Sequence, residues 1–226
     1  MTDVVRIDLH VHSLHSPDSR LTLDEIAGRL PYVGLKGFAL TDHNSVAGHR
    51  DLPGLRERFP GLLVIPGVEV STREGHLLLY GVSEAPPVGR PIEETLSWAE
   101  QRGGIAVLAH PFRWIHGVGA RVARTARVAA LEVVNGHTSA VANAKAELIA
   151  AQRHLGATGG SDVHEINDVG RAFTEFAPDV DSVEGLLEGL RQAHTAGRGN
   201  SLRWPGRLRW GFRTGIFRIA RGFRSV

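Results

Sequence analysis

Short apolar segments rich in β-branched residues alternate along the chain with segments that have helical spacing. The apolar segments predict strands at Val4–Val11, Gly37–Leu40, Leu62–Val70, His76–Val82, Ile105–Ala109, Ala130–Val134, Gly156–Gly159 and Val169–Phe176. Between the strands, helix-start residues predict helices that begin near Thr22, Ser45, Pro91, Val118, Ser139 and Asp181.

This alternation indicates an α/β fold with a buried, mostly parallel sheet, because strands covered on both faces are apolar along their whole length. Seven or eight strand–helix units in one domain favour a closed or nearly closed barrel. An open doubly wound sheet is the alternative, but no GxGxxG pattern follows the first strand.

Side chains that can bind metals follow nearly every predicted strand. They are His10, His12 and Asp18 after the first strand, His43 after the second, Glu69 at the end of the third, His76 at the start of the fourth, His110 after the fifth, and Asp162 and His164 after the seventh. In an α/β barrel the loops after the strands meet on one face, where active sites form. Carboxylates gathered there repel one another and lose hydration, so we expect cations between them.

The composition limits the chemistry of such a site. The 226 residues include no cysteine, which excludes thiolate zinc fingers, iron–sulfur clusters and a cysteine nucleophile. Twelve histidines stand against two lysines, so imidazole and carboxylate are the expected ligands. These ligands suit zinc, manganese or iron.

The segments DLHVHS, LTDHN, PGVEVS, AHP and GGSDVH resemble the successive motifs of the polymerase-and-histidinol-phosphatase (PHP) family, from about residue 6 to residue 176. The resemblance implies a distorted (β/α)7 TIM-like barrel with three divalent metal ions. The implied ligands are His10, His12 and Asp162 for the first ion, His76 and His110 for the second with Glu69 bridging the two, and Asp18, His43 and His164 for the third. His15 lies near Asp18 and could compete for its place.

The resemblance also implies a metal-dependent phosphoesterase, in which a hydroxide bridging two ions attacks phosphorus. We expect a small-molecule phosphomonoester as substrate. No insertion between the motifs is large enough to form a cap domain, so short loops are expected to select the substrate. The alternatives are a nucleotide phosphatase or exonuclease acting on short nucleic acid, and a non-catalytic, metal-stabilised binding module. An amidohydrolase-like deacylase is disfavoured, since Lys36 and Lys145 do not lie at strand ends as its metal-bridging lysine would.

Two further residues are candidates for substrate contact. Arg113, directly after AHPF, could bind a phosphate with two parallel hydrogen bonds. His137, after the strand in LEVVNGH, could protonate the leaving oxygen or contact the substrate. Trp114 is predicted to be a packed aromatic at the rim. The histidines without a surrounding motif are predicted to lie at the surface, namely His49, His116, His154 and His194.

Residues 197–226 are predicted to form an Arg-rich amphipathic tail beyond a phosphoesterase domain at residues 1–196. No Asp or Glu follows Glu188, whereas residues 1–188 hold 24 acidic and 17 basic residues, a net charge of −7 within an overall charge of +2. The apolar stripe of the tail is Leu208, Phe212, Ile216, Ile219 and Phe223. Such a segment can dock on the barrel or on a second subunit of a homo-oligomer, or bind nucleic acid or an anionic membrane. Without a signal peptide or a membrane-spanning stretch, we expect a cytoplasmic protein.

Overall fold

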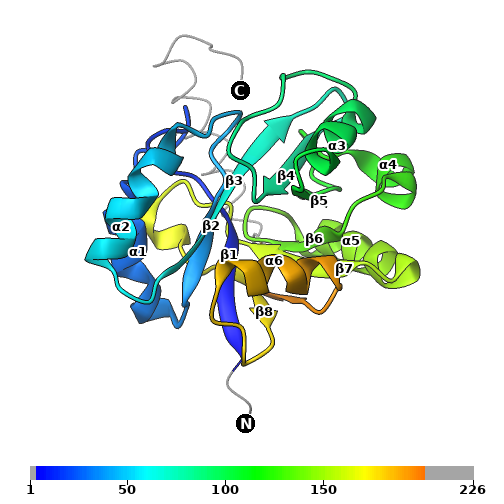
Figure 1. Cartoon of the computed structure of the whole chain (residues 1–226). Helices are drawn as coiled ribbons and strands as arrows, with labels where there is room; N and C mark the ends of the chain where they lie inside the picture. Colours follow the sequence, from blue (N-terminus) through cyan, green and yellow to red (C-terminus); the bar gives the residue numbers. More distant parts are fainter. Residues whose placement is uncertain (1–3, 202–226) are drawn as a thin grey trace.

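In the computed structural model, which describes residues 4–201, nine strands form one sheet that curves into a nearly closed barrel (Figure 1). The strands are β1 (Val5–Val11), β2 (Gly37–Leu40), β3 (Leu63–Ser71), β4 (His76–Tyr80), β5 (Ile105–Leu108), β6 (Ala130–Asn135), β7 (Gly156–Gly160), β8 (Ala172–Phe176) and β9 (Ala196–Gly199). Their order in the sheet is β7-β6-β5-β4-β3-β2-β1-β8-β9. The prediction of an α/β, TIM-like barrel in a single domain is confirmed.

Hydrogen bonds between the end of β7 and β1 close the barrel at its mouth. The amide of Asp162 donates to the carbonyl of His10 at 2.8 Å, and Val163 forms a parallel bridge with Val11. Residues from the first and last motifs are therefore neighbours, although most of the chain lies between them.

The sheet is mixed, so the expectation of a mostly parallel sheet is wrong. Strand pairs β1–β2, β2–β3, β5–β6 and β6–β7 are parallel, whereas β3–β4, β4–β5, β1–β8 and β8–β9 are antiparallel. A short connection joins β3 to β4 as a hairpin that pairs Ser71 with His76. Because β4 runs in the opposite direction, its first residue, His76, lies at the same rim as the last residues of β3.

The helices begin within about two residues of the predicted positions, apart from one that opens as a 3-10 turn. They are α1 (Leu23–Arg29), α2 (Leu52–Arg58), α3 (Ile92–Glu100), α4 (Gly119–Thr125), α5 (Ala140–Arg153) and α6 (Val183–Arg191), with 3-10 turns at Leu30–Val33, Ala47–Asp51 and Ile166–Asp168. Thr22 and Glu25 form a capping box at the start of α1. The hydroxyls of Ser139 and Ser182 cap α5 and α6 in the same way, by accepting backbone N–H groups.

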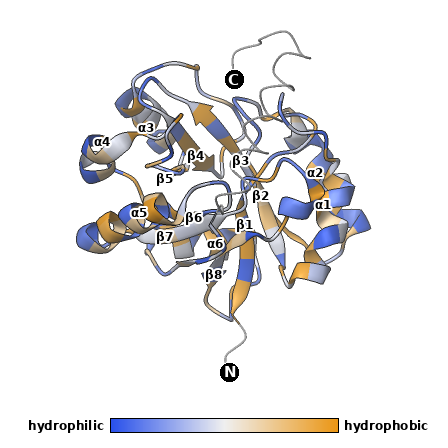
Figure 2. Ribbon diagram, turned by 180° about the vertical axis from the view of Figure 1, so that it is seen from behind, coloured by the Kyte–Doolittle hydropathy of each residue, from blue (hydrophilic) through white to orange (hydrophobic). Residues whose placement is uncertain are grey.

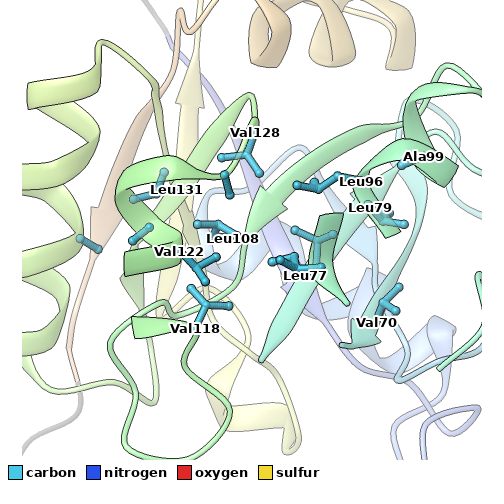
Figure 3. Packing of buried hydrophobic residues seen from close by; sticks show 14 of the residues in the cluster. Val70, Leu77, Leu79, Leu96, Ala99, Leu108, Val118, Val122, Val128 and Leu131 are labelled. Carbon is cyan, nitrogen blue, oxygen red and sulfur yellow. The ribbon is translucent and has the colours of Figure 1, made fainter. Parts of the chain in front are cut away.

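Apolar residues pack both inside and outside the barrel. On the outer side, Leu77 and Leu108 of the sheet pack against Leu96 of α3 and Val122 of α4 (Figure 3). Figure 2 shows hydrophilic residues interspersed with hydrophobic ones along the helices, as expected when only one face of each helix is covered.

Inside the barrel, apolar residues fill the end opposite the metal-binding motifs. Val5 and Ile105, at the starts of β1 and β5, belong to one buried cluster with Leu186 and Leu190 of α6. Helix α6 thus covers this end of the barrel, which leaves the other end for polar side chains.

Strand β9 pairs with β8 and contains the expected boundary between residues 196 and 197. The rest of the predicted amphipathic tail, including its apolar stripe, lies outside the described residues. Within residues 4–201, none of the helices combines the length and the apolar character needed to cross a bilayer.

Candidate metal centre

Glu69 on β3 lies at the centre of a cluster of histidines. Its Oε1 atom is 2.7 Å from Nδ1 of His76 and 3.0 Å from Nε2 of His110. Its Oε2 atom is 3.1 Å from Nε2 of His10 and 3.1 Å from Nδ1 of His43. The two carboxylate oxygens therefore face histidines delivered by β1, β4 and the loops after β2 and β5.

Asp162, after β7, is a second carboxylate that histidines contact, beside Glu69. Its Oδ1 atom is 3.2 Å from Nε2 of His12 and 3.6 Å from Nε2 of His10. The rings of His10 and His12 lie 5.0 Å apart, and both approach the same carboxylates. This confirms that the HxH spacing places both imidazoles on one side of the chain.

Asp18, in the loop between β1 and α1, is the third carboxylate that histidines contact. Its Oδ2 atom is 3.0 Å from Nε2 of His164 and 3.2 Å from Nε2 of His43. His15 instead contacts Asp51 at 2.9 Å. The structure thus gathers all nine expected ligand side chains at one mouth of the barrel, and places Asp18 rather than His15 among them.

The ligand atoms fit divalent cations. Four overlapping sets of three ligand atoms lie within 4.8 Å of one another: His12, His43 and His164; His10, His110 and Asp162; His10, His12 and Glu69; and His43, Glu69 and His76. Within the described residues, Nε2 of His10, both ring nitrogens of His12, and Oε2 of Glu69 are buried without a hydrogen-bond partner. Buried polar atoms are seldom left in this state, so shared cations are a natural partner for them.

The pKa values of several cluster residues are shifted by the charges of their neighbours. Burial alone would raise the pKa of Glu69, but His43 and His10 hold it well below its usual range. Burial alone would lower the pKa of His12, but Asp162 and Glu69 raise it to about 10. Burial and the nearby Arg113 lower the pKa of His110 to about 3. Without metal, the carboxylates are therefore ionised and protons on some imidazoles supply part of the balancing charge.

Two of the ligand residues have an uncommon backbone conformation. His110 has φ of 27° and Asp162 has φ of 58°, which is the left-handed region that non-glycine residues rarely occupy. Such strain persists where surrounding contacts over-determine the conformation, as they commonly do at functional sites.

The two substrate-contact candidates lie beside the cluster. The guanidinium of Arg113 donates to Oδ2 of Asp162 and, at 3.2 Å, to Oδ1 of Asn135. Nε2 of His137 is 3.3 Å from Oδ2 of Asp168, and its ring centroid is 5.9 Å from that of His164. Burial lowers the pKa of His137, and Asp168 opposes that shift.

Glu132 on β6 belongs to the cluster although it was not predicted from the sequence, and several aromatic side chains lie elsewhere than predicted. Glu132 is fully buried and contacts two of the histidines, and its signal was a carboxylate within the apolar segment ALEVV. His49 and His116, predicted at the surface, are half-buried. Nε2 of His49 hydrogen bonds to the Gly67 carbonyl, and His116 stacks on His76 with ring centroids 4.4 Å apart. Trp114 is 95% exposed rather than packed.

Comparisons with known proteins find relatives of this chain. A family model described as PHP-associated matches residues 141–195. The uncharacterized protein MJ1587 of Methanocaldococcus jannaschii is 30% identical over 118 residues, which span 48% of this chain and 68% of that protein.

Two solved structures share the fold. A two-domain protein from Bacteroides vulgatus, containing a predicted PHP-like metal-dependent phosphoesterase, superposes with a TM-score of 0.72 at 21% identity, over 94% of this chain and 70% of that one. Endonuclease Q, in complex with a 27-mer duplex carrying an abasic lesion, superposes with a TM-score of 0.69 at 19% identity, over 88% of this chain and 60% of that one.

Proposed function

Because the chain belongs to the PHP family, we propose that it is a metal-dependent phosphoesterase that hydrolyses a small-molecule phosphomonoester. The observation that carries the proposal is the position of Glu69, whose carboxylate lies within 3.3 Å of histidine nitrogens from β1, β4 and three loops. These histidines are His10, His12, His43, His76 and His110. A buried carboxylate surrounded by imidazoles at a barrel mouth suits a ligand shared between two cations.

Three divalent ions of zinc, manganese or iron would share the nine side chains. His10, His12 and Asp162 would hold the first, His76 and His110 the second with Glu69 bridging the two, and Asp18, His43 and His164 the third. When bound, such ions would activate water and offset negative charge on the phosphoryl group.

Two side chains would act on the substrate directly. Arg113 lies against Asp162, where its guanidinium can donate to a phosphate oxygen that enters the cluster. His137 is held by Asp168 on the same side, next to His164. In this position His137 would protonate the leaving oxygen or contact the substrate.

The test is a screen of full-length, metal-reconstituted protein against phosphomonoesters, cyclic nucleotides and short oligonucleotides. We expect inorganic phosphate to be released from a phosphomonoester, and a chelator and the Glu69→Gln substitution each to abolish the release. Failure of the metal-loaded protein to hydrolyse any of these esters would contradict the proposal. A non-catalytic, metal-stabilised binding module would then be the remaining interpretation.

A second candidate function is the hydrolysis of nucleic acid. It is supported by the fold shared with Endonuclease Q and by seven arginines without any acidic residue in residues 202–226. Activity on short oligonucleotides that falls steeply with salt, and with removal of residues 202–226, would favour it over a small substrate.

A further inference from the structure

Glu132 is a fully buried carboxylate on β6 that belongs to none of the proposed ligand sets. Its Oε1 atom lies 2.9 Å from Nδ1 of His10, within hydrogen-bond distance. Its Oε2 atom accepts hydrogen bonds from the backbone N–H of His110 at 2.7 Å and from the side-chain amide of Asn135 at 3.1 Å. One carboxylate therefore contacts residues assigned to two different ions.

The contact with Oε1 fixes how His10 is presented to the cluster. An imidazole that donates its Nδ1 proton to a carboxylate leaves Nε2 as its free lone pair, and the hydrogen bond also fixes the ring orientation. Nε2 of His10 is the atom that faces Glu69 at 3.1 Å and Asp162 at 3.6 Å.

The contact with Oε2 acts on the backbone of His110. This residue has φ of 27°, so its conformation needs support from its surroundings. The hydrogen bond from its N–H to Glu132 gives that support, while Nε2 of the same residue lies 3.0 Å from Glu69. The Asn135 amide also reaches Oδ2 of Asp162 at 3.3 Å, which joins a further ligand to the same network.

The backbone of β7 packs closely against these groups at Gly160. A Cβ atom on Gly160 would lie 2.3 Å from Cβ of His10 and 2.8 Å from Oε1 of Glu132. A glycine at this position is therefore needed for β7 to approach His10 and Glu132 this closely.

We propose that Glu132 is a positioning residue that sets the tautomer of His10 and the backbone of His110, and so couples binding of the first two metal ions. The inference rests on the proposed metal centre. The hydrogen bonds of Glu132 described above reach ligands assigned to the first two ions, so we expect the third ion, assigned to Asp18, His43 and His164, to lose the least affinity when Glu132 is replaced.

The first test is a zinc titration of Glu132→Gln against a chromophoric chelator. Glutamine offers one acceptor oxygen where the carboxylate offers two, so either His10 loses its partner, or His110 and Asn135 lose theirs. We expect the affinity for two of the three ions to fall by roughly 10- to 100-fold, the usual effect of removing such a partner. Glu175→Gln is the matched control, because Glu175 lies on β8 and pairs with Arg6 and Arg198. Unchanged affinity for all ions, or equal loss of all three, would overturn the proposal.

A second test needs no variant and therefore does not depend on whether Glu132→Gln folds. In the zinc-loaded wild-type protein, ¹⁵N NMR of histidine side chains reports which ring nitrogen carries the proton. We expect Nδ1 of His10 to be protonated, and an unprotonated Nδ1 would overturn the proposal. The first test reads metal binding and the second reads the protonation of a ring nitrogen. Neither depends on hydrolysis, so a metal-loaded but inactive protein would overturn the proposed function alone.

Discussion

The carboxylate of Asp18 lies 3.0 Å from the imidazole of His164, although 146 residues separate the two along the chain. The same oxygen is 3.2 Å from His43, so a single loop carboxylate joins the ends of β2 and β7. His15, three residues earlier, contacts Asp51 instead. Asp18 therefore lies inside the cluster, whereas His15, which could also bind a metal, lies outside it.

Substitutions of Asp18 and of His15 should therefore differ in their effects on metal content and activity. Asp18→Asn removes the charge that we propose holds a third ion, so we expect one ion fewer per chain and a fall in kcat/KM of at least about 100-fold. His15→Gln is the control and should keep both the metal content and the activity. Metal analysis after gel filtration, together with phosphatase kinetics, measures both, and a loss of metal in His15→Gln alone would contradict the assignment.

The gathering of the proposed ligand side chains at one rim could be predicted, because each of them is tied to a local pattern. His10, His12, Glu69, His110 and Asp162 lie at or just after the ends of apolar strands, and strand ends in an α/β barrel share one rim. His76 reaches the same rim for another reason, since the short connection from β3 makes a hairpin. The apolar pattern of β4 gives no strand direction, so the antiparallel pairing could not be predicted from it.

Other features depend on contacts that local patterns do not contain. In the sequence, Glu132 is only a charged residue within an apolar strand. Its contacts with His10 and His110, one on each carboxylate oxygen, appear only in the folded structure. The stacking of His116 on His76 requires the loop after β5 to fold back onto β4, where the His116 carbonyl accepts the N–H of His76. The exposure of Trp114 is likewise a property of how this loop folds and not of the residues around it.

Substitution of Arg113 should weaken the reaction without removing the metals. Its guanidinium contacts Asp162 but provides no ligand atom, so Arg113→Ala should keep the metal content and lower kcat/KM by about 10²- to 10³-fold. Arg113→Lys should recover only part of this loss, because an ammonium group cannot make two parallel hydrogen bonds to phosphate.

The control for this prediction is Arg124→Ala, which removes an exposed arginine in the last turn of α4. Steady-state kinetics with metal analysis distinguishes the outcomes. Wild-type kinetics in Arg113→Ala would exclude a role for this residue in binding phosphate.

Gly160 and Gly28 should respond to alanine in opposite directions. Gly160→Ala places a methyl group 2.3 Å from Cβ of His10, and overpacking of this kind destabilises by about 1–3 kcal/mol. Gly28 lies within α1 with no atom within 4 Å of an added Cβ, so Gly28→Ala should stabilise by about 0.5–1 kcal/mol. Urea unfolding of both variants tests the pair, and equal destabilisation would contradict the packing described for β7.

The metal-free protein should lose stability as pH rises. Asp162 and Glu69 raise the pKa of His12 to about 10, above its ordinary value of 6.5, so the folded state binds this proton more tightly than the unfolded state. The stabilisation is complete below pH 6.5 and disappears as pH rises through about 10.

Thermal unfolding in a chelator, over this pH range, should therefore show a falling Tm, and His12→Asn should reduce the slope. A Tm that rises over the same range would contradict the assigned charges. The same proton must leave when a metal binds His12, so zinc binding should release protons in a calorimeter and tighten with pH.

The most direct test of the account is a crystal structure of the full-length protein grown with manganese, with anomalous diffraction data. We predict three anomalous peaks at the barrel mouth, two of them in contact with the carboxylate of Glu69 and the third between Asp18, His43 and His164. Anomalous maps without a peak at Glu69, from crystals of active protein, would contradict the claim that these nine side chains form the catalytic metal centre.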